Sequence, residues 1–272
     1  MIDDYTIIIK TFERFQCIKR LVATVLKVYP NACILIGDDS QTSCKRYFEK
    51  HFPNANLKVF ELPKDCGLSY GRNYLLDHVE TKYFILCDDD FLFDDMTDLE
   101  SGLQLLNQNQ LDIIGGYFRN YSCIRKVSDN FKVLVQEIFH LERLYNYIGS
   151  IVLDENNRIL YAEYITNEFP DFTLTDITHN FFIGRTKIIR ETNRWDDELK
   201  VHEHTAFFLK AKQNNLRVGF TNKMSVRHKP IRSQLYSSYR NRDFFQVFLR
   251  KYKIKRFVVK YNGITVRIVD CL

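Results

Sequence analysis

The first half of the chain alternates short apolar runs with segments of helical periodicity. Apolar residues recur at helical spacing from Ile18 to Leu26, and again from Leu68 to Val79. Four runs with high β propensity lie around these segments, at 5–9, 33–37, 57–62 and 83–87. Strands that alternate with helices are typical of βαβ units, so we predict an α/β fold with a mainly parallel sheet flanked by helices.

The pattern is less regular in the second half. The runs 147–153 and 158–164 flank the polar segment 154–157 and predict a β-hairpin. Further strands are predicted at 180–183 and 217–220, and a helix over 203–214.

One more helix is indicated between the two halves. Leu99, Leu103 and Leu106 form an apolar stripe, and Thr97 and Glu100 have the spacing of a capping box at its start. No linker rich in Pro, Gly or Ser and no internal repeat interrupts the chain. We therefore predict one mixed α/β domain over 1–233, followed by a C-terminal extension over 234–272 that packs on it.

The extension and the residues just before it are strongly basic. Between Arg227 and Lys260 there are eleven Lys and Arg residues against Asp243 alone. Phe244, Phe245, Phe248 and Leu249 interleave with them at helical spacing, which predicts a helix face packed on the body. The charge permits peripheral contact with an anionic membrane, whereas nucleic acid is the less favoured partner.

Composition limits the class of protein. The 272 residues are 45% hydrophobic and 27% charged, with only 10 Gly and 5 Pro, so the chain is expected to be globular. No apolar run approaches the roughly 18 residues of a membrane span, and the sequence as given is expected to be soluble. The seven cysteines contain no CxxC pair, so neither a disulfide framework nor a zinc site is indicated.

Three adjacent carboxylates, Asp88, Asp89 and Asp90, follow the apolar run 83–87. Ligands of parallel α/β sheets bind beyond the carboxyl ends of the strands. Mg²⁺ or Mn²⁺ is usually held there by one or two carboxylates together with phosphate oxygens. The triplet therefore favours a site for a metal and a diphosphate, and the alternative is a solvated acidic turn.

Weaker signals lie near other predicted strand ends. Asp38 and Asp39 follow the strand at 33–37 and suit a ribose hydroxyl or a base imide, although they also fit an ordinary turn. Gly67 opens a loop that leads through Arg72 into a helix and suits an anion. His228 is either a structural histidine or a metal ligand.

Taken in order, segments spread over residues 6–228 resemble a GT-A glycosyltransferase. More closely, these segments resemble the β-1,4-N-acetylgalactosaminyltransferases that build gangliosides and related glycans. The matching segments are 8–14, 29–30, 36–40, 71–73, 81–83, 88–91, 111–116, 180–182, 185–186, 195–199, 207–209, 216–219 and 226–228, with Gly67, Asp176 and His204 between them.

The resemblance implies inverting transfer of a sugar, by preference GalNAc, from a UDP-sugar to a glycan or glycolipid hydroxyl, with Mn²⁺ or Mg²⁺. The implied nucleotide-sugar residues are Thr11, Asp38, Asp39, Gly67, Arg72, Asp88 and Asp89. The implied metal ligands are Asp88 and Asp90 of a DxD element together with His228.

The chain departs from the family at one important position. The family tends to carry an acidic residue directly before Phe-Phe-Leu, where the acceptor-activating base is expected, but this chain has Ala206. Glu203, three residues earlier, is our first candidate for the base, and Asp176 is the second. The remaining alternative is impaired activity.

A second class of function stays open at this point, namely an anion-binding or nucleic-acid-binding protein on a degenerate transferase fold. A nucleotidyltransferase or phosphatase is disfavoured, because the first strand has no Gly-rich loop after it and the triplet lacks the DxDxT/V form. The family is usually anchored in the Golgi, so the Golgi lumen is expected if this is an excised domain, and the cytoplasm otherwise.

Overall fold

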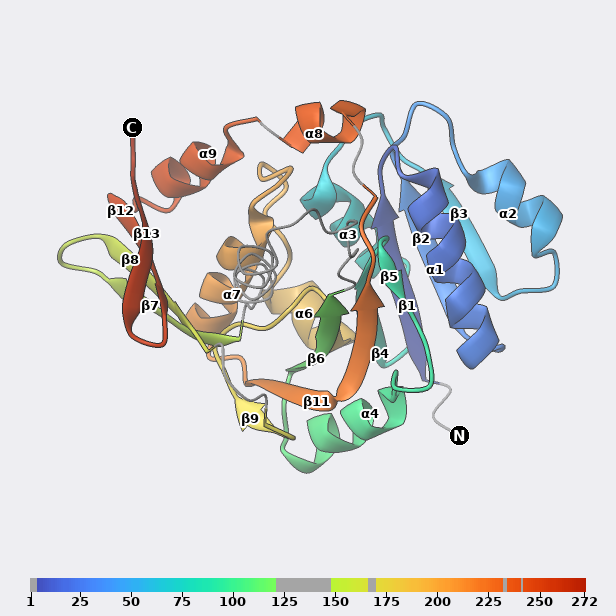
Figure 1. The fold of residues 1–272 in the computed structure, drawn as a ribbon, viewed down its shortest axis with the longest axis horizontal. Helices are drawn as coiled ribbons and strands as arrows, with labels where there is room; N and C mark the ends of the chain where they lie inside the picture. Colours follow the sequence, from blue (N-terminus) through green and yellow to red (C-terminus); the bar gives the residue numbers. More distant parts are fainter. Residues whose placement is uncertain (1–3, 121–147, 166–169, 232–233, 241) are drawn as a thin grey trace, which may run out of the picture.

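A computed structural model describes residues 4–120, 148–165, 170–231, 234–240 and 242–272 (Figure 1). Residues 1–3, 121–147, 166–169 and 232–233 of the predicted domain, and residue 241 of the predicted extension, lie outside this range. In chain order the elements are β1 (Tyr5–Thr11), α1 (Phe15–Val28), β2 (Cys33–Asp38), α2 (Lys45–His51), β3 (Leu57–Glu61), α3 (Leu68–Asp77), β4 (Tyr83–Asp88), β5 (Phe91–Leu92), α4 (Leu99–Gln108), β6 (Ile113–Asn120), β7 (Gly149–Asp154), β8 (Ile159–Tyr164), β9 (Thr173–Leu174), β10 (Phe182–Arg185), α6 (Thr186–Thr192), α7 (Glu203–Gln213), β11 (Val218–His228), α8 (Gln234–Arg240), α9 (Phe244–Lys251), β12 (Arg256–Tyr261) and β13 (Ile264–Asp270).

The main sheet has the order β3-β2-β1-β4-β10-β6-β11-β5, and β9 pairs with β11. Its first four strands run parallel, β10 is antiparallel to both of its neighbours, and β6 and β11 are again parallel. The predicted mixed and mainly parallel sheet is confirmed.

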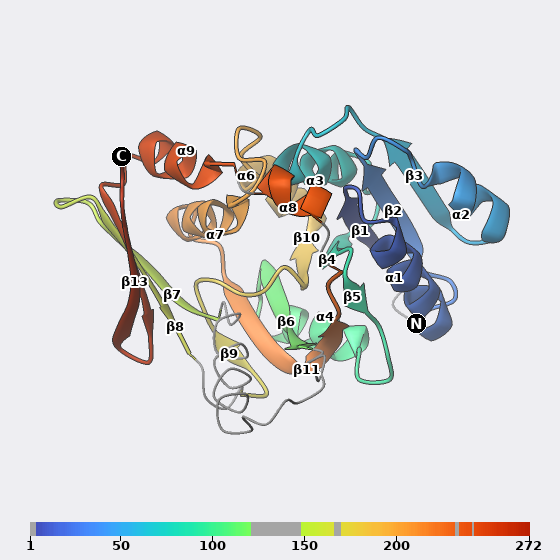
Figure 2. The ribbon, with the colours of Figure 1, turned by 45° about the horizontal axis from the view of Figure 1, so that its top comes forward.

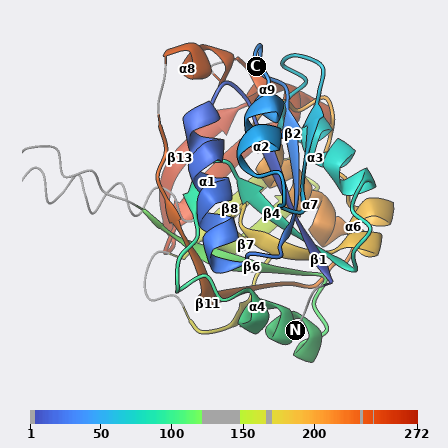
Figure 3. The same ribbon diagram turned by 90° about the vertical axis from the view of Figure 1, so that its right-hand side faces the viewer.

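Helices cover both faces of this sheet because the strands are apolar on both sides. Ile7 and Ile9 of β1 face one core, which they share with Leu21 of α1. Ile8 between them faces a second core with Leu75 of α3. Figure 3 shows α1 and α3 on opposite sides of the strands.

A smaller sheet, β13-β12-β8-β7, stands beside α7 and α9 (Figure 2). The predicted hairpin forms its β7 and β8, which pair antiparallel. β12 then adds in parallel to β8, so residues beyond 233 are built into this sheet. Phe248 and Leu249 of α9 are buried in the core shared with α7.

Three predicted boundaries are wrong. The helix α4 is capped by Asp98, whose carboxylate accepts from Ser101 N, whereas Thr97 donates to the Ser225 carbonyl. The strand predicted to end at 220 continues as β11 to His228, after a register shift between Phe220 and Ser225. The strand predicted at 180–183 is β10, which begins two residues later.

Among the described residues, none of the helices combines the length and the apolar character that crossing a membrane requires.

Candidate active site

Strands β1, β2 and β4 end side by side and place their last residues at one edge of the sheet. Thr11 pairs in register with Asp38, and Lys10 pairs with Asp88. Because these strands are parallel, the two acidic segments predicted after β2 and β4 meet beyond the carboxyl edge, as expected for a ligand site of an α/β sheet.

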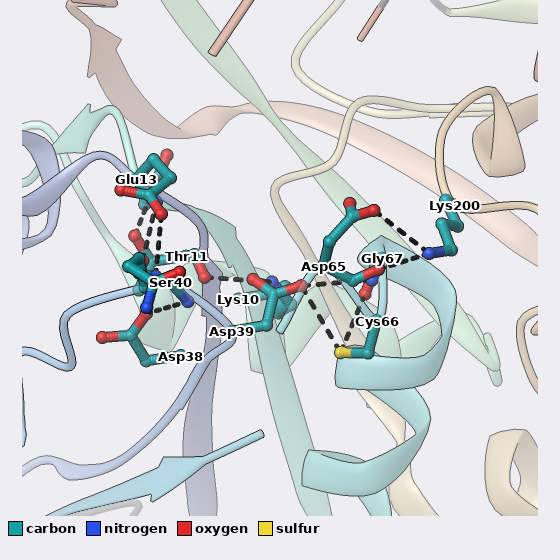
Figure 4. Close-up of polar contacts among 12 residues, drawn as sticks. Lys10, Thr11, Glu13, Asp38, Asp39, Ser40, Asp65, Cys66, Gly67 and Lys200 are labelled. Atoms are coloured by element: carbon teal, nitrogen blue, oxygen red, sulfur yellow. Dashed lines mark hydrogen bonds and ion pairs between the residues drawn. The ribbon is translucent and has the colours of Figure 1, made fainter. Parts of the chain in front are cut away.

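Asp38 and Asp39 shape the loops on one side of this edge (Figure 4). Asp38 accepts hydrogen bonds from Ser40 N at 3.0 Å and from Cys44 N at 2.7 Å. Asp39 forms a buried ion pair with Lys10 and accepts from Gly67 N at 3.1 Å. Both carboxylates therefore fix backbone that surrounds the site.

Gly67 has a conformational reason to be glycine. Its φ of +96° lies in the left-handed region, and a Cβ there would approach the backbone Cα of Lys200 to 2.7 Å. The next residue, Leu68, donates its N–H to the Lys200 carbonyl at 3.0 Å. Gly67 thus lets the start of α3 pack directly against the segment that leads to α7.

The Asp triplet is divided among different partners. Asp88 Oδ1 lies 2.8 Å from Arg72 Nη2, and Asp89 Oδ2 accepts from Thr11 Oγ1 at 2.7 Å. Arg14 bridges the other two, with Nη1 3.0 Å from Asp89 Oδ1 and Nη2 2.5 Å from Asp90 Oδ2. The same Asp90 oxygen lies 3.2 Å from His228 Nε2.

These surroundings shift the pKa values of the buried Asp89 and Asp90 carboxyls in opposite directions. Burial raises the pKa of Asp89, and the charge of Arg14 only partly opposes this. Burial also acts to raise the pKa of Asp90, but the hydrogen bond with His228 and the charge of Arg14 outweigh it and hold the pKa below its usual range. Asp90 is therefore the member of the pair that stays ionised most firmly.

Arg72 connects the triplet to α7. Its side chain is 1% exposed, and its Nη1 lies 2.5 Å from Glu203 Oε1 while Nη2 binds Asp88. Glu203 is likewise 3% exposed, in the first turn of α7. The guanidinium of Arg72 thus forms ion pairs with both Asp88, a candidate metal ligand, and Glu203, the candidate base.

A pocket of about 290 Å³ opens at this edge. It brings together the predicted residues Asp88, Asp89, Asp90, Glu203 and His228, whereas Thr11, Asp38, Asp39, Gly67 and Arg72 are not among its lining residues. A larger hollow, of about 1010 Å³, lies at the opposite ends of the strands and contains none of these residues. Its lining includes Thr6, Cys33 and Leu57.

Several lining residues were missed by the sequence reasoning. Tyr236 of α8 and Phe245 of α9 come from the C-terminal segment, whose interleaved aromatic and basic residues were the available signal. Asn180 and His204 also line the pocket, with His204 Nδ1 2.7 Å from Asn180 Oδ1. Burial lowers the pKa of His204 to about 4, so its ring is neutral at pH 7.

The predicted metal ligands are brought together in part. Asp90 and His228 are adjacent, but Asp88 turns to Arg72. Among the described residues, no group of three or more His, Cys, Asp or Glu side chains is arranged to hold a metal ion. The donor types nevertheless fit the expected ions, since carboxylate suits Mg²⁺ and Mn²⁺ and imidazole adds a nitrogen ligand.

Comparison with known proteins defines the class. The family described as Glycosyl transferase family 2 matches residues 6–192. The chain therefore belongs to glycosyl transferase family 2, which agrees with the predicted GT-A glycosyltransferase.

Individual relatives share about 30% or less of their aligned residues with this chain. Beta-1,4 N-acetylgalactosaminyltransferase 1 of Rattus norvegicus is 28% identical over 245 residues, covering 86% of this chain and 42% of that protein. The Mus musculus enzyme of the same name is 30% identical over 223 residues, covering 82% of this chain and 38% of that protein. The chain thus spans about two fifths of the length of these relatives.

Solved structures share the fold. The crystal structure of S. aureus TarS 1-349 in complex with UDP-GlcNAc matches with a TM-score of 0.62 and 17% identity, over 92% of this chain and 65% of that one. The crystal structure of the same TarS fragment in complex with UDP matches with a TM-score of 0.58.

Proposed function

We propose that this protein transfers a sugar, by preference GalNAc, from a UDP-sugar to a hydroxyl of a glycan or glycolipid acceptor, with inversion at the anomeric carbon. The observation that carries the proposal is the Asp triplet at the carboxyl edge of a family 2 sheet, opening into a pocket that also contains Glu203 and His228. The names of the relatives support an N-acetylhexosamine donor.

A divalent cation, Mn²⁺ or Mg²⁺, would be held by Asp90 and His228, with Asp88 as the further carboxylate. When bound, it supplies positive charge that stabilises the diphosphate as a leaving group. Thr11, Asp38, Asp39 and Gly67 are proposed to act on the uridine side, where their hydrogen bonds order the loops. Arg72 keeps Asp88 in place.

Glu203 is proposed as the base. Its carboxylate takes the proton of the acceptor hydroxyl, the acceptor oxygen forms a bond to the anomeric carbon, and the bond from that carbon to UDP breaks with its electron pair leaving on UDP. Asp176, the second candidate, pairs with Lys212 at 2.6 Å and is not among the residues that line the pocket. Ala206 is buried in the apolar core.

A donor screen tests the proposal. UDP release is measured with UDP-GalNAc, UDP-GlcNAc, UDP-galactose and UDP-glucose, each with Mn²⁺, with Mg²⁺ and with a chelator. We expect release that requires the cation and is fastest with an N-acetylhexosamine donor. Absence of release with every donor, with or without a galactose-ended acceptor, would contradict the proposed activity.

Asp90→Ala is expected to abolish cation-dependent UDP binding while the protein remains folded. Without this carboxylate, the proposed cation loses one of its ligands and is held less tightly. The negative charge of the diphosphate is then less well compensated. Calorimetric titration of UDP in the presence of Mn²⁺ measures the effect. The matched control is Asp95→Ala, which removes an exposed carboxylate five residues away. Equal UDP affinities of the Asp90 variant and the wild type would place the cation elsewhere.

The basic extension gives less support to the alternative function, anion or nucleic-acid binding, than its composition indicated. Arg242 pairs with Asp65, Lys251 with Asp196, and Arg256 with Asp270, so part of its charge is neutralised within the molecule. Contact with an anionic membrane stays a prediction.

A further inference from the structure

Arg14 lies where a cation is expected to act. It is the residue directly before α1, its side chain is 8% exposed, and its two terminal nitrogens contact Asp89 and Asp90 at 3.0 and 2.5 Å. Two carboxylates of the triplet are therefore already compensated by a positive charge of the protein itself.

The same guanidinium has a second set of contacts on its other side. Nη1 donates to the Tyr236 hydroxyl at 3.1 Å, and the guanidinium carbon lies 4.6 Å from the centre of the Tyr236 ring. This aromatic face from α8 can hold an arginine by cation–π attraction independently of the carboxylates.

The hydrogen bonding of Arg14 is incomplete in this position. Its Nε is buried, and among the described residues none accepts a hydrogen bond from it. A buried donor of a charged group is costly to leave unsatisfied.

Arg14 and His228 meet at one oxygen of Asp90. The oxygen that Arg14 contacts, Oδ2, also lies next to Nε2 of His228, which is a further predicted metal ligand. A divalent ion held by Asp90 and His228 would share Asp90 Oδ2 with the guanidinium, and the two positive charges would repel each other.

Building on the proposed function, we propose that Arg14 and the divalent cation compete for Asp90. Cation binding displaces the guanidinium, which stays in the pocket against Tyr236 and there faces the diphosphate of the donor. Arg14 is thus a positioning residue that compensates the Asp pair before the cation binds and the diphosphate afterwards.

Mn²⁺ titration of the nucleotide-free protein tests the competition without relying on activity. Arg14→Gln is expected to bind Mn²⁺ at least about tenfold more tightly than the wild type, because the competing charge is gone. Arg14→Lys retains that charge and should stay close to the wild type. The matched control Arg194→Gln removes an arginine that pairs with Asp77 and is not among the residues lining the pocket, and it should leave Mn²⁺ affinity unchanged.

The proposed role of Arg14 at the diphosphate is tested by titrating UDP at saturating Mn²⁺. There, Arg14→Gln should bind UDP more weakly than the wild type, since the diphosphate has lost a cationic partner. Unchanged or weaker Mn²⁺ binding by Arg14→Gln would overturn the competition, and unchanged UDP binding would overturn the role at the diphosphate. If neither protein binds Mn²⁺ even with UDP present, the cation dependence of the proposed function fails as well.

Discussion

Glu203→Gln is expected to lower turnover by about 10²–10⁴-fold while the affinity for the UDP-sugar changes little. Glutamine has nearly the shape of glutamate and can accept a hydrogen bond from Arg72, but it cannot take the proton of the acceptor hydroxyl. Steady-state kinetics with donor and acceptor, together with calorimetric titration of UDP, measure the two quantities separately.

The ion pair with Arg72 makes a structural role the main competing explanation for Glu203. A purely structural carboxylate would, when replaced, weaken UDP binding and lower the unfolding temperature together with the rate. Glu198→Gln is the matched control, because Glu198 is exposed and pairs with Lys251 at 3.0 Å outside the pocket. Normal turnover of Glu203→Gln would show that the base lies elsewhere.

Arg72→Met is expected to lower the free energy of unfolding by about 3–5 kcal/mol. Methionine fills most of the volume of the arginine stem, so the loss comes mainly from Glu203, which is left buried without its cation, and from Asp88. The exposed pair of Arg194 with Asp77 provides the control, since Arg194→Met should cost at most about 1 kcal/mol. Denaturant unfolding of both variants measures the difference.

A double variant distinguishes two causes of the lost stability, the unpaired buried charge of Glu203 and the lost packing around Arg72. Arg72→Met combined with Glu203→Gln removes the buried negative charge as well, and should recover part of the stability lost in the single variant. If the double variant is as unstable as the two single losses added together, the pair is not coupled, and the cost belongs to packing around Arg72.

The site residues that directly follow strands could be predicted from sequence, because an apolar run and the polar residues after it are neighbours in the chain. An apolar run such as 83–87 reports a buried strand, and the polar residues after it must then lie at the sheet edge. The positions of the Asp triplet, Asp38 and Asp39 at the sheet edge could therefore be predicted. The resemblance added Glu203 and supported His228, and both line the same pocket as the triplet.

The partners of those residues could not be predicted in the same way. Arg14 and Asp90 are 76 positions apart, and Arg72 and Glu203 are 131 apart, so no periodicity or motif spacing reports the contact. Local signals also failed where two residues competed for one role, as with Thr97 and Asp98 at the start of α4. The continuation of β11 past residue 220 was missed because the polar residues 221–223 interrupt the apolar run, at the point where the pairing register shifts.

The contact between Arg14 and Tyr236 bears on how the protein matures during translation. The two residues are separated by 222 positions, and β12 must reach back to pair with β8. Closing such long loops is entropically costly and slow. While residues 236–261 are still being synthesised, β1 to β4 and the Asp triplet are already available to fold, but one wall of the pocket is missing. A nascent chain can therefore build its sheet early, whereas the pocket for the proposed donor is complete only after this later segment leaves the ribosome.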